Sequence, residues 1–243
     1  LWDAVMNQVD MAKESDAAEE YERQATLQAL QSQINPHFLY NTLECIRGQA
    51  LMDGNTSVAD MLEALGNFFR YSISRRENVV TLADEINNIR SYMLIQNYRF
   101  LNRYQFELEF LEDEEPLLGC YVPKLTLQPI VENALIHGFQ NQKSGCVTLT
   151  VDASDSMLML TISDDGEGMD AAVLEELNRK IQSRQTLLRK PASHGNGIAL
   201  QNVNRRIMML YGRSYGLHAY STPGRGTDVE IILPRITKAE VTP

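Results

Sequence analysis

The sequence predicts an α + α/β fold, in which a helical segment comes first and an α/β domain follows, with a boundary near residue 104. Two observations support this prediction. In residues 1–103, Gly and Pro are sparse while Glu, Gln, Ala, Leu and Met are common, as in helices. From Tyr104 to Phe110, apolar and polar residues alternate, and a period of two is typical of a half-buried strand.

The residue pattern of the helical segment predicts several helices that pack together. Apolar residues at helical spacing form the stripe that a bundle or coiled-coil seam requires: Leu27, Leu30, Ile34 and Phe38. The stretch MDGNTS, residues 52–57, is a loop signal between two helices. We expect one helix over 58–74 and another that begins near Thr81 and runs towards Phe100.

The remaining residues predict alternating helices and strands. Helices are expected over 125–139 and 198–211, and strands over 146–152, 157–163, 217–221 and 227–233. The segment 169–194 is polar, helix-forming in part, and too long for an ordinary connection. We expect it to be a lid over a site, and a disordered insertion is the alternative.

The composition indicates one or two globular domains and argues against some functions. Of the 243 residues, 44% are hydrophobic and 22% are charged, which is enough for a core. The formal net charge of -10 disfavours nucleic-acid binding, because an acidic chain repels phosphate backbones. The three cysteines have neither metal-ligand nor disulfide spacing, which favours a reducing compartment.

Nothing in the sequence predicts a membrane span. The chain has no apolar run of the roughly 20 residues that cross a bilayer, and it has no signal peptide. It begins at Leu1 rather than at Met. We therefore expect a soluble piece of a longer protein.

The block QINPHFLYNTL contains a candidate nucleophile. Pro36 removes a backbone donor and kinks a helix beside His37, whose ring flanks the apolar stripe and can reach solvent. Imidazole titrates near pH 6.5, so a neutral ring nitrogen can attack a phosphoryl group. Asn41 lies one helical turn on and could orient a water or the phosphorylated ring. The alternative is an ordinary histidine on a bundle helix.

The block QPIVENALIHG predicts a polar face on the helix over 125–139. Asn133 and His137 are four residues apart and share that face, with Glu132 one step around it. An amide oxygen suits a Mg²⁺ that keeps most of its waters and bridges phosphates, and Glu132 could polarise a water or order the site. Without the glycine-rich blocks, a solvated helix face would explain these residues better.

The glycine-rich blocks predict a nucleotide site. Asp164 could accept from the exocyclic amine of adenine, and Gly166 and Gly168 would let the backbone pass close to a flat base. Gly195 and Gly197 precede a helix whose free N–H groups favour phosphate. The alternative for the first block is a plain Asp-Gly turn.

A last glycine turn joins the two final strands. It contains Gly224 and Gly226 and is followed by Thr227, and we include all three as candidate nucleotide contacts. On spacing alone, an ordinary hairpin turn explains them better.

These four blocks, in this order, resemble those of the LytS/YesM-like sensor histidine kinases, over about residues 25–234. The resemblance implies that His37 is phosphorylated. It also implies a GHKL (Bergerat) ATP-binding fold, an α/β sandwich with a mixed sheet backed by helices. The boxes of that fold would be matched by Glu132, Asn133 and His137, then by Asp164, Gly166 and Gly168, and then by Gly195 and Gly197.

The same resemblance implies an organisation and a set of partners. Residues 1–33 would be a signalling helix, 34–103 the dimerisation and phosphoacceptor helices, 104–236 the ATP-binding catalytic domain and 237–243 a tail. ATP and Mg²⁺ would be the cofactors. The partners would be a second copy of the chain, an upstream membrane sensor segment and the aspartate of a response regulator. The chain would be the cytoplasmic portion of a cell-membrane protein.

The sequence departs from the family pattern at two positions of the ATP-binding region. Ile136 stands where the family usually has a lysine, and Ala199 where it usually has a glycine. Phe38 follows His37 where the commonest histidine kinases have an acidic residue, a difference that this family shares. Two other readings stay open: a GHKL ATPase that works as a conformational clamp, and a scaffold that dimerises without turnover.

Overall fold

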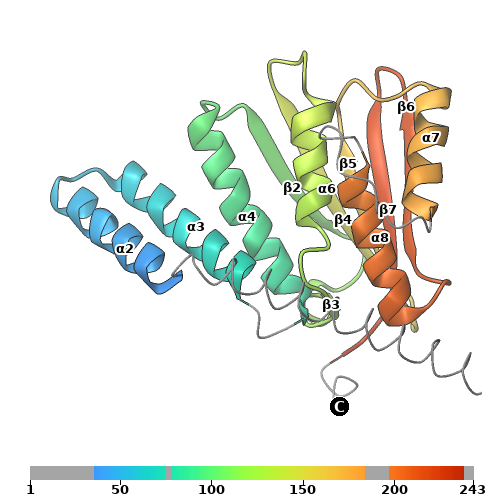
Figure 1. Ribbon diagram of the computed structural model, residues 1–243, viewed down its shortest axis with the longest axis horizontal. Helices are drawn as coiled ribbons and strands as arrows, with labels where there is room; N and C mark the ends of the chain where they lie inside the picture. Colours follow the sequence, from blue (N-terminus) through green and yellow to red (C-terminus); the bar gives the residue numbers. More distant parts are fainter. Residues whose placement is uncertain (1–35, 75–77, 184–196, 238–243) are drawn as a thin grey trace, which may run out of the picture.

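The computed structural model describes residues 36–74, 78–183 and 197–237, in which a helical hairpin lies beside an α/β sandwich (Figure 1). The hairpin consists of α2 (Pro36–Met52) and α3 (Thr56–Ile73). Asn55 caps α3 by accepting a hydrogen bond from the backbone N–H of Val58 at 3.2 Å. The predicted loop and helix are therefore confirmed, with the helix starting two residues earlier.

A short strand and a long helix connect the hairpin to the sheet. Strand β1 (Val79–Thr81) is followed by α4 (Leu82–Arg99), and Thr81 forms a capping box with Asp84. Strand β1 pairs antiparallel with β3 (Tyr121–Pro123), which follows the short helix α5 (Glu114–Leu118). This two-stranded sheet and α5 have no counterpart in the sequence prediction.

The main sheet is mixed and has five strands. Its order is β2 (Tyr104–Phe110), β4 (Gly145–Ala153), β5 (Met157–Asp164), β7 (Gly226–Pro234) and β6 (Gly216–Thr222). The β2–β4 pair is parallel and the others are antiparallel. Each strand predicted from alternation is present, extended by up to a few residues, because alternation marks a surface that is buried on one side.

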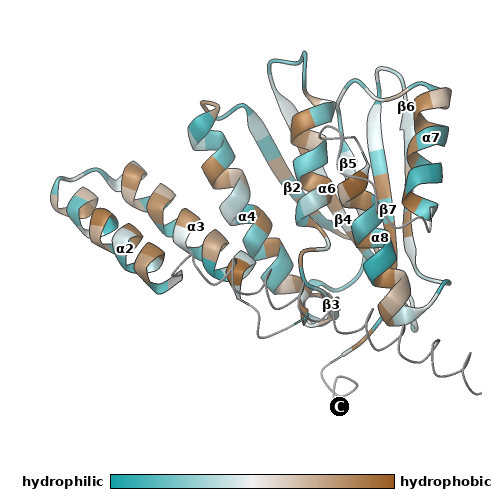
Figure 2. Ribbon diagram, viewed as in Figure 1, coloured by the Kyte–Doolittle hydropathy of each residue, from teal (hydrophilic) through white to brown (hydrophobic). Residues whose placement is uncertain are grey.

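Helices cover one face of this sheet (Figure 1). They are α4, α6 (Gln128–Asn133) with the π-helix η1 (Ala134–Gly138), α7 (Ala171–Gln182) and α8 (Ile198–Tyr211). Hydrophobic and hydrophilic residues are interspersed along these helices (Figure 2). The residues that α4, α6 and α8 bury are mostly apolar. This is the α/β sandwich with a mixed sheet backed by helices, so the predicted fold class is confirmed.

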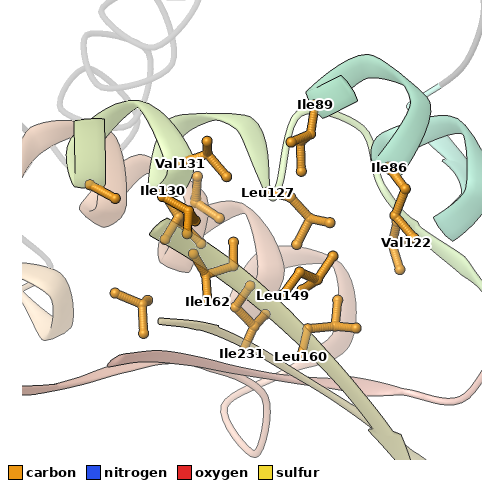
Figure 3. Packing of buried hydrophobic residues seen from close by; sticks show 14 of the residues in the cluster. Ile86, Ile89, Val122, Leu127, Ile130, Val131, Leu149, Leu160, Ile162 and Ile231 are labelled. Atoms are coloured by element: carbon orange, nitrogen blue, oxygen red, sulfur yellow. The ribbon is translucent and has the colours of Figure 1, made fainter. Parts of the chain in front are cut away.

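The hydrophobic core lies between the helices and the sheet (Figure 3). Val147, Leu149 and Val151 of β4 are fully buried, as are Leu158 and Leu160 of β5. Each such side chain contributes about 1.5–3 kcal/mol to stability.

This core extends to the N-terminal side of residue 104. Leu82, Ile86 and Ile89 of α4 are buried in the same cluster as Leu127 and Leu149 (Figure 3). Helix α4 thus packs as part of the sandwich. The assignment of residues 34–103 to the phosphoacceptor part and of 104–236 to the catalytic part stays a prediction about function, and residues 1–33 lie outside the described residues.

One predicted segment differs from the structure, and another is confirmed in part. The helix expected over 125–139 begins at Gln128 and changes after Asn133 into the π-helical turn η1, a form that is rare and often found at functional sites. Leu125, where the helix was expected to begin, has φ +59°, which no helix accommodates. In the predicted lid, α7 forms, and the part beyond Ser183 lies outside the described residues.

No helix in the described ranges is long and apolar enough to cross a lipid bilayer.

Candidate nucleotide-binding site

A cavity of about 510 Å³ opens between α6–η1, the end of β5, α7 and the start of α8. Much of its wall is apolar, including Ile130, Ile162, Leu177, Leu200 and Val229. A few polar groups converge on it, as is usual in small-molecule sites. They include Asn133, His137, Asp164, Lys180 and Thr227.

The structure brings together six of the residues that the sequence singled out. Asn133, His137, Asp164, Gly168, Gly197 and Thr227 all line the cavity. They come from four segments of the chain, so the spacing of the blocks did not by itself show that they meet. Glu132, Gly166, Gly224 and Gly226 are not among the lining residues, and Gly195 lies outside the described residues.

The side chain of Asn133 has an unsatisfied polar atom in this wall. Its Nδ2 atom is buried and has no hydrogen-bond partner in the described structure. A buried amide without a partner costs roughly 1–3 kcal/mol, and a ligand that accepts from Nδ2 would offset this cost. The amide can turn either its nitrogen or its oxygen towards a ligand, which fits phosphate oxygens or a hydrated cation.

Asp164 ends β5 at the floor of the cavity. Its Oδ1 atom accepts a hydrogen bond from the backbone N–H of Gly166 at 3.0 Å. Burial raises the pKa of this carboxyl to about 6, although the N–H groups of Gly166 and Thr227 act in the opposite direction. A half-buried carboxyl beside apolar walls can accept from a flat, polar-edged ligand such as adenine.

The glycines around Asp164 are required by close contacts within the protein. A Cβ atom on Gly226, which has φ +89°, would lie 1.7 Å from the carbonyl oxygen of Asp164. A Cβ atom on Gly168, which has φ +66°, would lie 2.1 Å from the carbonyl oxygen of Thr222, and one on Gly166 would lie 2.4 Å from that of Gly138. The sequence argument attributed such glycines to a nearby base, whereas here three backbone segments crowd one another.

Gly197 begins α8 at the edge of the cavity. It has φ +99° and is the N-cap of this 14-residue helix, and a Cβ atom there would lie 3.1 Å from Leu177 Cδ1. The first N–H groups of a helix lack intrahelical partners and carry the positive end of its dipole. Anionic groups are therefore favoured at this end of the cavity.

Lys180 is a cavity residue that the sequence argument missed. It lies on α7, and its Nζ atom is 3.5 Å from Glu176 Oε1, which also lines the cavity. The charged face of α7 looks like an ordinary solvated helix surface in the sequence. Only the folding of α7 over the cavity shows that this ammonium group can meet a phosphate.

Glu132 faces away from the cavity, towards α4. Its Oε1 atom accepts a hydrogen bond from Gln128 Nε2 at 2.7 Å, and Gln128 Oε1 accepts one from Asn88 Nδ2 at 2.7 Å. The half-buried carboxylate is thus held beside α4, one position before Asn133. A role in polarising a water would require it to act from outside the cavity wall.

His37 and Asn41 lie in the first turns of α2, both exposed. The Nδ2 atom of Asn41 is 3.2 Å from Nδ1 of His37. An amide nitrogen can only donate, so in this arrangement Nδ1 accepts and Nε2 carries the ring proton. If the amide turns over, its oxygen accepts from Nδ1–H and Nε2 is unprotonated.

Two family models match the chain. The model described as histidine kinase matches residues 25–104, and the one described as histidine kinase-, DNA gyrase B-, and HSP90-like ATPase matches residues 123–237. The first contains His37 and the second contains all the cavity residues named above. The chain belongs to the sensor histidine kinase family.

Curated sensor histidine kinases of this family resemble the chain over most of its length. The Sensor histidine kinase YesM of Bacillus subtilis is 36% identical over 213 residues, which are 87% of this chain and 34% of that protein. The Sensor protein LytS of Bacillus anthracis is 32% identical over 213 residues, with the same coverage. The chain therefore spans about a third of the length of the relatives it matches.

Among solved structures, one match is the histidine kinase domain from Erythrobacter litoralis EL346 blue-light activated histidine kinase. It has a TM-score of 0.44 and 19% identity, and the match covers 90% of this chain and 94% of that one.

The two positions that depart from the sensor histidine kinase pattern lie outside the cavity wall. Ile136 has an exposed fraction of 56% and Ala199 is exposed, and neither lines the cavity. The lysine that the family usually has at position 136 would therefore lie outside the cavity wall. The wall has a cation of its own, Lys180.

Proposed function

We propose that this chain is the autophosphorylating core of a two-component sensor histidine kinase. ATP binds in the cavity with Mg²⁺, its γ-phosphoryl group is transferred to His37, and the group then passes to the aspartate of a response regulator. The cavity carries this proposal, because its wall combines Asn133, whose buried Nδ2 atom has no hydrogen-bond partner in the described structure, with Asp164 and the start of α8.

Each end of the cavity suits a different part of ATP. The carboxylate of Asp164 accepts from the adenine amine, and the apolar wall covers the faces of the base. Lys180 and the first N–H groups of α8 hold the phosphates. His137 and Thr227 supply further polar groups to the lining.

Asn133 is the protein group best placed to hold the metal. In the described part of the chain, no group of three or more His, Cys, Asp or Glu side chains could bind a metal ion. Mg²⁺ commonly takes one or two protein ligands and completes its octahedron with waters and phosphate oxygens. When bound, it would neutralise charge on the phosphates.

The transfer step uses a ring nitrogen of His37 as the nucleophile. The new bond joins that nitrogen to the γ-phosphorus, the bond from the γ-phosphorus to the bridging oxygen breaks, and ADP leaves with that oxygen. Helix α2 lies at the opposite end of the molecule from α7 (Figure 1). The hairpin must therefore move towards a cavity, either that of its own chain or that of a second copy.

The hairpin supports a homodimer. Phe38, Ile46, Leu51 and Met52 of α2 are large apolar residues with exposed fractions from 47% to 77%. A two-helix hairpin cannot bury so many apolar side chains by itself, and a second hairpin would complete a four-helix bundle. In the full-length protein, an upstream membrane sensor segment would act on this bundle, and the chain would be its cytoplasmic portion.

Autophosphorylation with γ-labelled ATP and Mg²⁺ tests the proposal. The native chain should acquire label that is acid-labile and alkali-stable, as expected for phosphohistidine. His37→Gln should acquire none while still binding nucleotide. Asn133→Ala should lose about 100-fold in rate, the effect of removing a group that contacts charge in the transition state.

A matched control and two contrary outcomes complete this test. His218 lies on the exposed part of β6, away from the cavity-lining residues, and His218→Gln should be labelled like the native chain. ATP hydrolysis without any protein label would indicate a conformational clamp. Nucleotide binding with neither label nor hydrolysis would indicate a scaffold.

A further inference from the structure

A buried carboxylate on α4 caps the start of the helix that carries Asn133. Glu85 is fully buried, and its Oε1 atom accepts from the backbone N–H of Leu125 at 2.6 Å. Its Oε2 atom accepts from Thr126 and Leu127 at 2.9 and 2.8 Å. Three consecutive N–H groups thus end on one side chain, immediately before α6 begins at Gln128.

The segment held by Glu85 is strained. Leu125 has φ +59°, a conformation that costs a non-glycine residue about 1 kcal/mol or more. Its N–H donates to Glu85, and its carbonyl oxygen accepts from Nη2 of Arg206 on α8 at 2.7 Å. Side chains from two helices therefore hold this residue, and such strain persists only where the surroundings impose it.

The hairpin is connected to the same carboxylate. The hydroxyl of Tyr71 on α3 donates to Oε1 of Glu85. Lys124 Nζ donates to the carbonyl oxygen of Ser74 at 2.7 Å and lies 4.8 Å from the centre of the Tyr71 ring. The end of α3 thus contacts both Glu85 and the residue before Leu125. We name Tyr71, Glu85, Leu125 and Arg206 the Glu85 junction.

The charged groups of the Glu85 junction surround the carboxyl of Glu85, which is buried away from water. Burial raises the pKa of Glu85, while the hydrogen bonds from Tyr71 and from the three backbone N–H groups act in the opposite direction. Burial lowers the pKa of Arg206, and the charge of Glu85 opposes that change. Each donor therefore helps to stabilise the buried carboxylate.

Only a few residues of the chain separate Leu125 of the Glu85 junction from Asn133 of the nucleotide site. Helix α6 runs for only six residues, from Gln128 to Asn133, and Asn133 lines the cavity. A helix of this length moves as a rigid piece, so displacement of residues 125–127 would displace Asn133 as well. A buried Glu that only caps a helix would not also need a donor from the hairpin.

We propose that Glu85 is a positioning residue that couples the His37 hairpin to the nucleotide site, with Tyr71 as the hairpin's contact and Asn133 as the group that is moved. This inference rests on the proposed function, since it assigns a role in nucleotide binding to residues that touch no nucleotide. Coupling of this kind is reciprocal. Nucleotide binding must therefore order the end of α3 as well as α6.

Hydrogen–deuterium exchange with and without ADP and Mg²⁺ tests this coupling. In the native chain, nucleotide should slow amide exchange in residues 128–138 and also in residues 66–74, which are the end of α3 and its C-cap. Tyr71→Phe keeps the ring and removes only the hydroxyl. It should retain the protection of 128–138 and lose that of 66–74. Tyr220→Phe is the matched control, because its hydroxyl lies 3.4 Å from Glu230 outside the junction, and both effects should remain.

A second variant measures the effect at the nucleotide site itself. Glu85→Gln replaces one acceptor oxygen with an NH₂ group that faces backbone donors, so the Kd for ADP should rise about tenfold, an effect of one lost charge-assisted hydrogen bond. Tyr71→Phe should change the Kd by less than about threefold. A Glu85→Gln variant that does not fold would leave the exchange experiment with Tyr71→Phe to decide.

The contrary outcomes separate the two proposals. Protection of residues 128–138 without protection of 66–74 in the native chain would overturn the coupling and leave nucleotide binding intact. Protection of both segments that survives Tyr71→Phe would also overturn it. Absence of any nucleotide-dependent protection in the native chain would overturn the coupling together with the proposed nucleotide site.

Discussion

The α2–α3 hairpin and the cavity side of the sandwich differ in how closely their backbones are packed. In the hairpin, a Cβ atom added to Gly48 or Gly66 would meet nothing within 4 Å. Around Asp164, a Cβ atom on Gly166, Gly168 or Gly226 would overlap a backbone carbonyl oxygen. The side with the proposed nucleotide site is built before a ligand arrives, whereas the side that carries His37 is left open and exposed.

This difference agrees with the proposed role of each part. A nucleotide site gains affinity when its groups are already in place, because little ordering is left to be done on binding. A phosphoacceptor has to meet the nucleotide in one state and a response regulator in another, so its histidine must stay accessible. The contrast predicts opposite responses to the same substitution in the two regions.

Glycine-to-alanine substitutions give the largest expected difference. Gly226→Ala should lower the free energy of unfolding by about 4 kcal/mol, since it combines positive φ with backbone overlap. Gly224→Ala, with φ +74° but open space around it, should cost only about 1 kcal/mol. Gly48→Ala, inside α2, should raise the stability of the hairpin by about 0.5–1 kcal/mol. Urea unfolding measures the stability of all three variants. Similar losses of stability in Gly226→Ala and Gly48→Ala would contradict the difference in packing between the two regions.

The pH dependence of nucleotide binding tests the role of Asp164 in the proposed nucleotide site. Burial raises the pKa of Asp164 to about 6, so the group is neutral well below that pH and ionised above it. The ionised form accepts the stronger hydrogen bond from the adenine amine. Affinity for ADP should therefore rise about fivefold as the pH rises from 5 to 7.5, the difference between a neutral and a charge-assisted hydrogen bond.

Asp164→Asn is the control for that measurement, because it cannot ionise but meets the same titration of the ADP phosphates. Its change in affinity over this pH range should be smaller than that of the native chain. Equal pH profiles for the two proteins would show that Asp164 does not bind the base as an anion.

The smallest expected effect lies in the open region. When the Asn41 amide is turned so that its oxygen accepts from Nδ1–H of His37, the ring is unprotonated at Nε2. Asn41→Ala removes that hydrogen bond and should lower the rate of autophosphorylation about threefold, because a smaller fraction of the rings is then unprotonated at Nε2. Asn41→Asp offers only acceptor oxygens, which favour Nδ1–H, and should restore the rate. Initial rates of labelling under single-turnover conditions measure both. A faster Asn41→Ala variant would reverse the assignment.

Much of the sandwich was predictable from the sequence because its signals are local. Strand β2 runs from Tyr104 to Phe110 as its alternation predicted, and α8 ends before Gly212 as expected. The pairing of β1 with β3 was not predictable, because three-residue strands have no measurable period and their partner lies about 40 residues away. The meeting of Asn133, Asp164 and Gly197 could be expected only from the family resemblance.

Glu85 is a second residue whose role could not be predicted from the sequence. Beside Thr81 it looks like a residue that helps to start a helix, and a helix does start there. The acidic partner in the capping box is Asp84, whereas Glu85 points inwards and binds backbone N–H groups some 40 residues later in the chain. A buried glutamate and an exposed one look the same in a sequence, and only the tertiary contacts of the folded chain distinguish them. The same holds for Lys180, whose place in the cavity wall depends on where α7 packs.

The order of strands in the sheet has a consequence for synthesis of the protein. Strand β7 is the last strand in the sequence, yet it lies between β5 and β6 inside the sheet and supplies Gly226 and Thr227. On the ribosome, the helical hairpin can form early from local contacts, but the sheet stays divided until the final strand has emerged. A nascent chain would therefore have its proposed phosphoacceptor helices well before its proposed nucleotide site was complete.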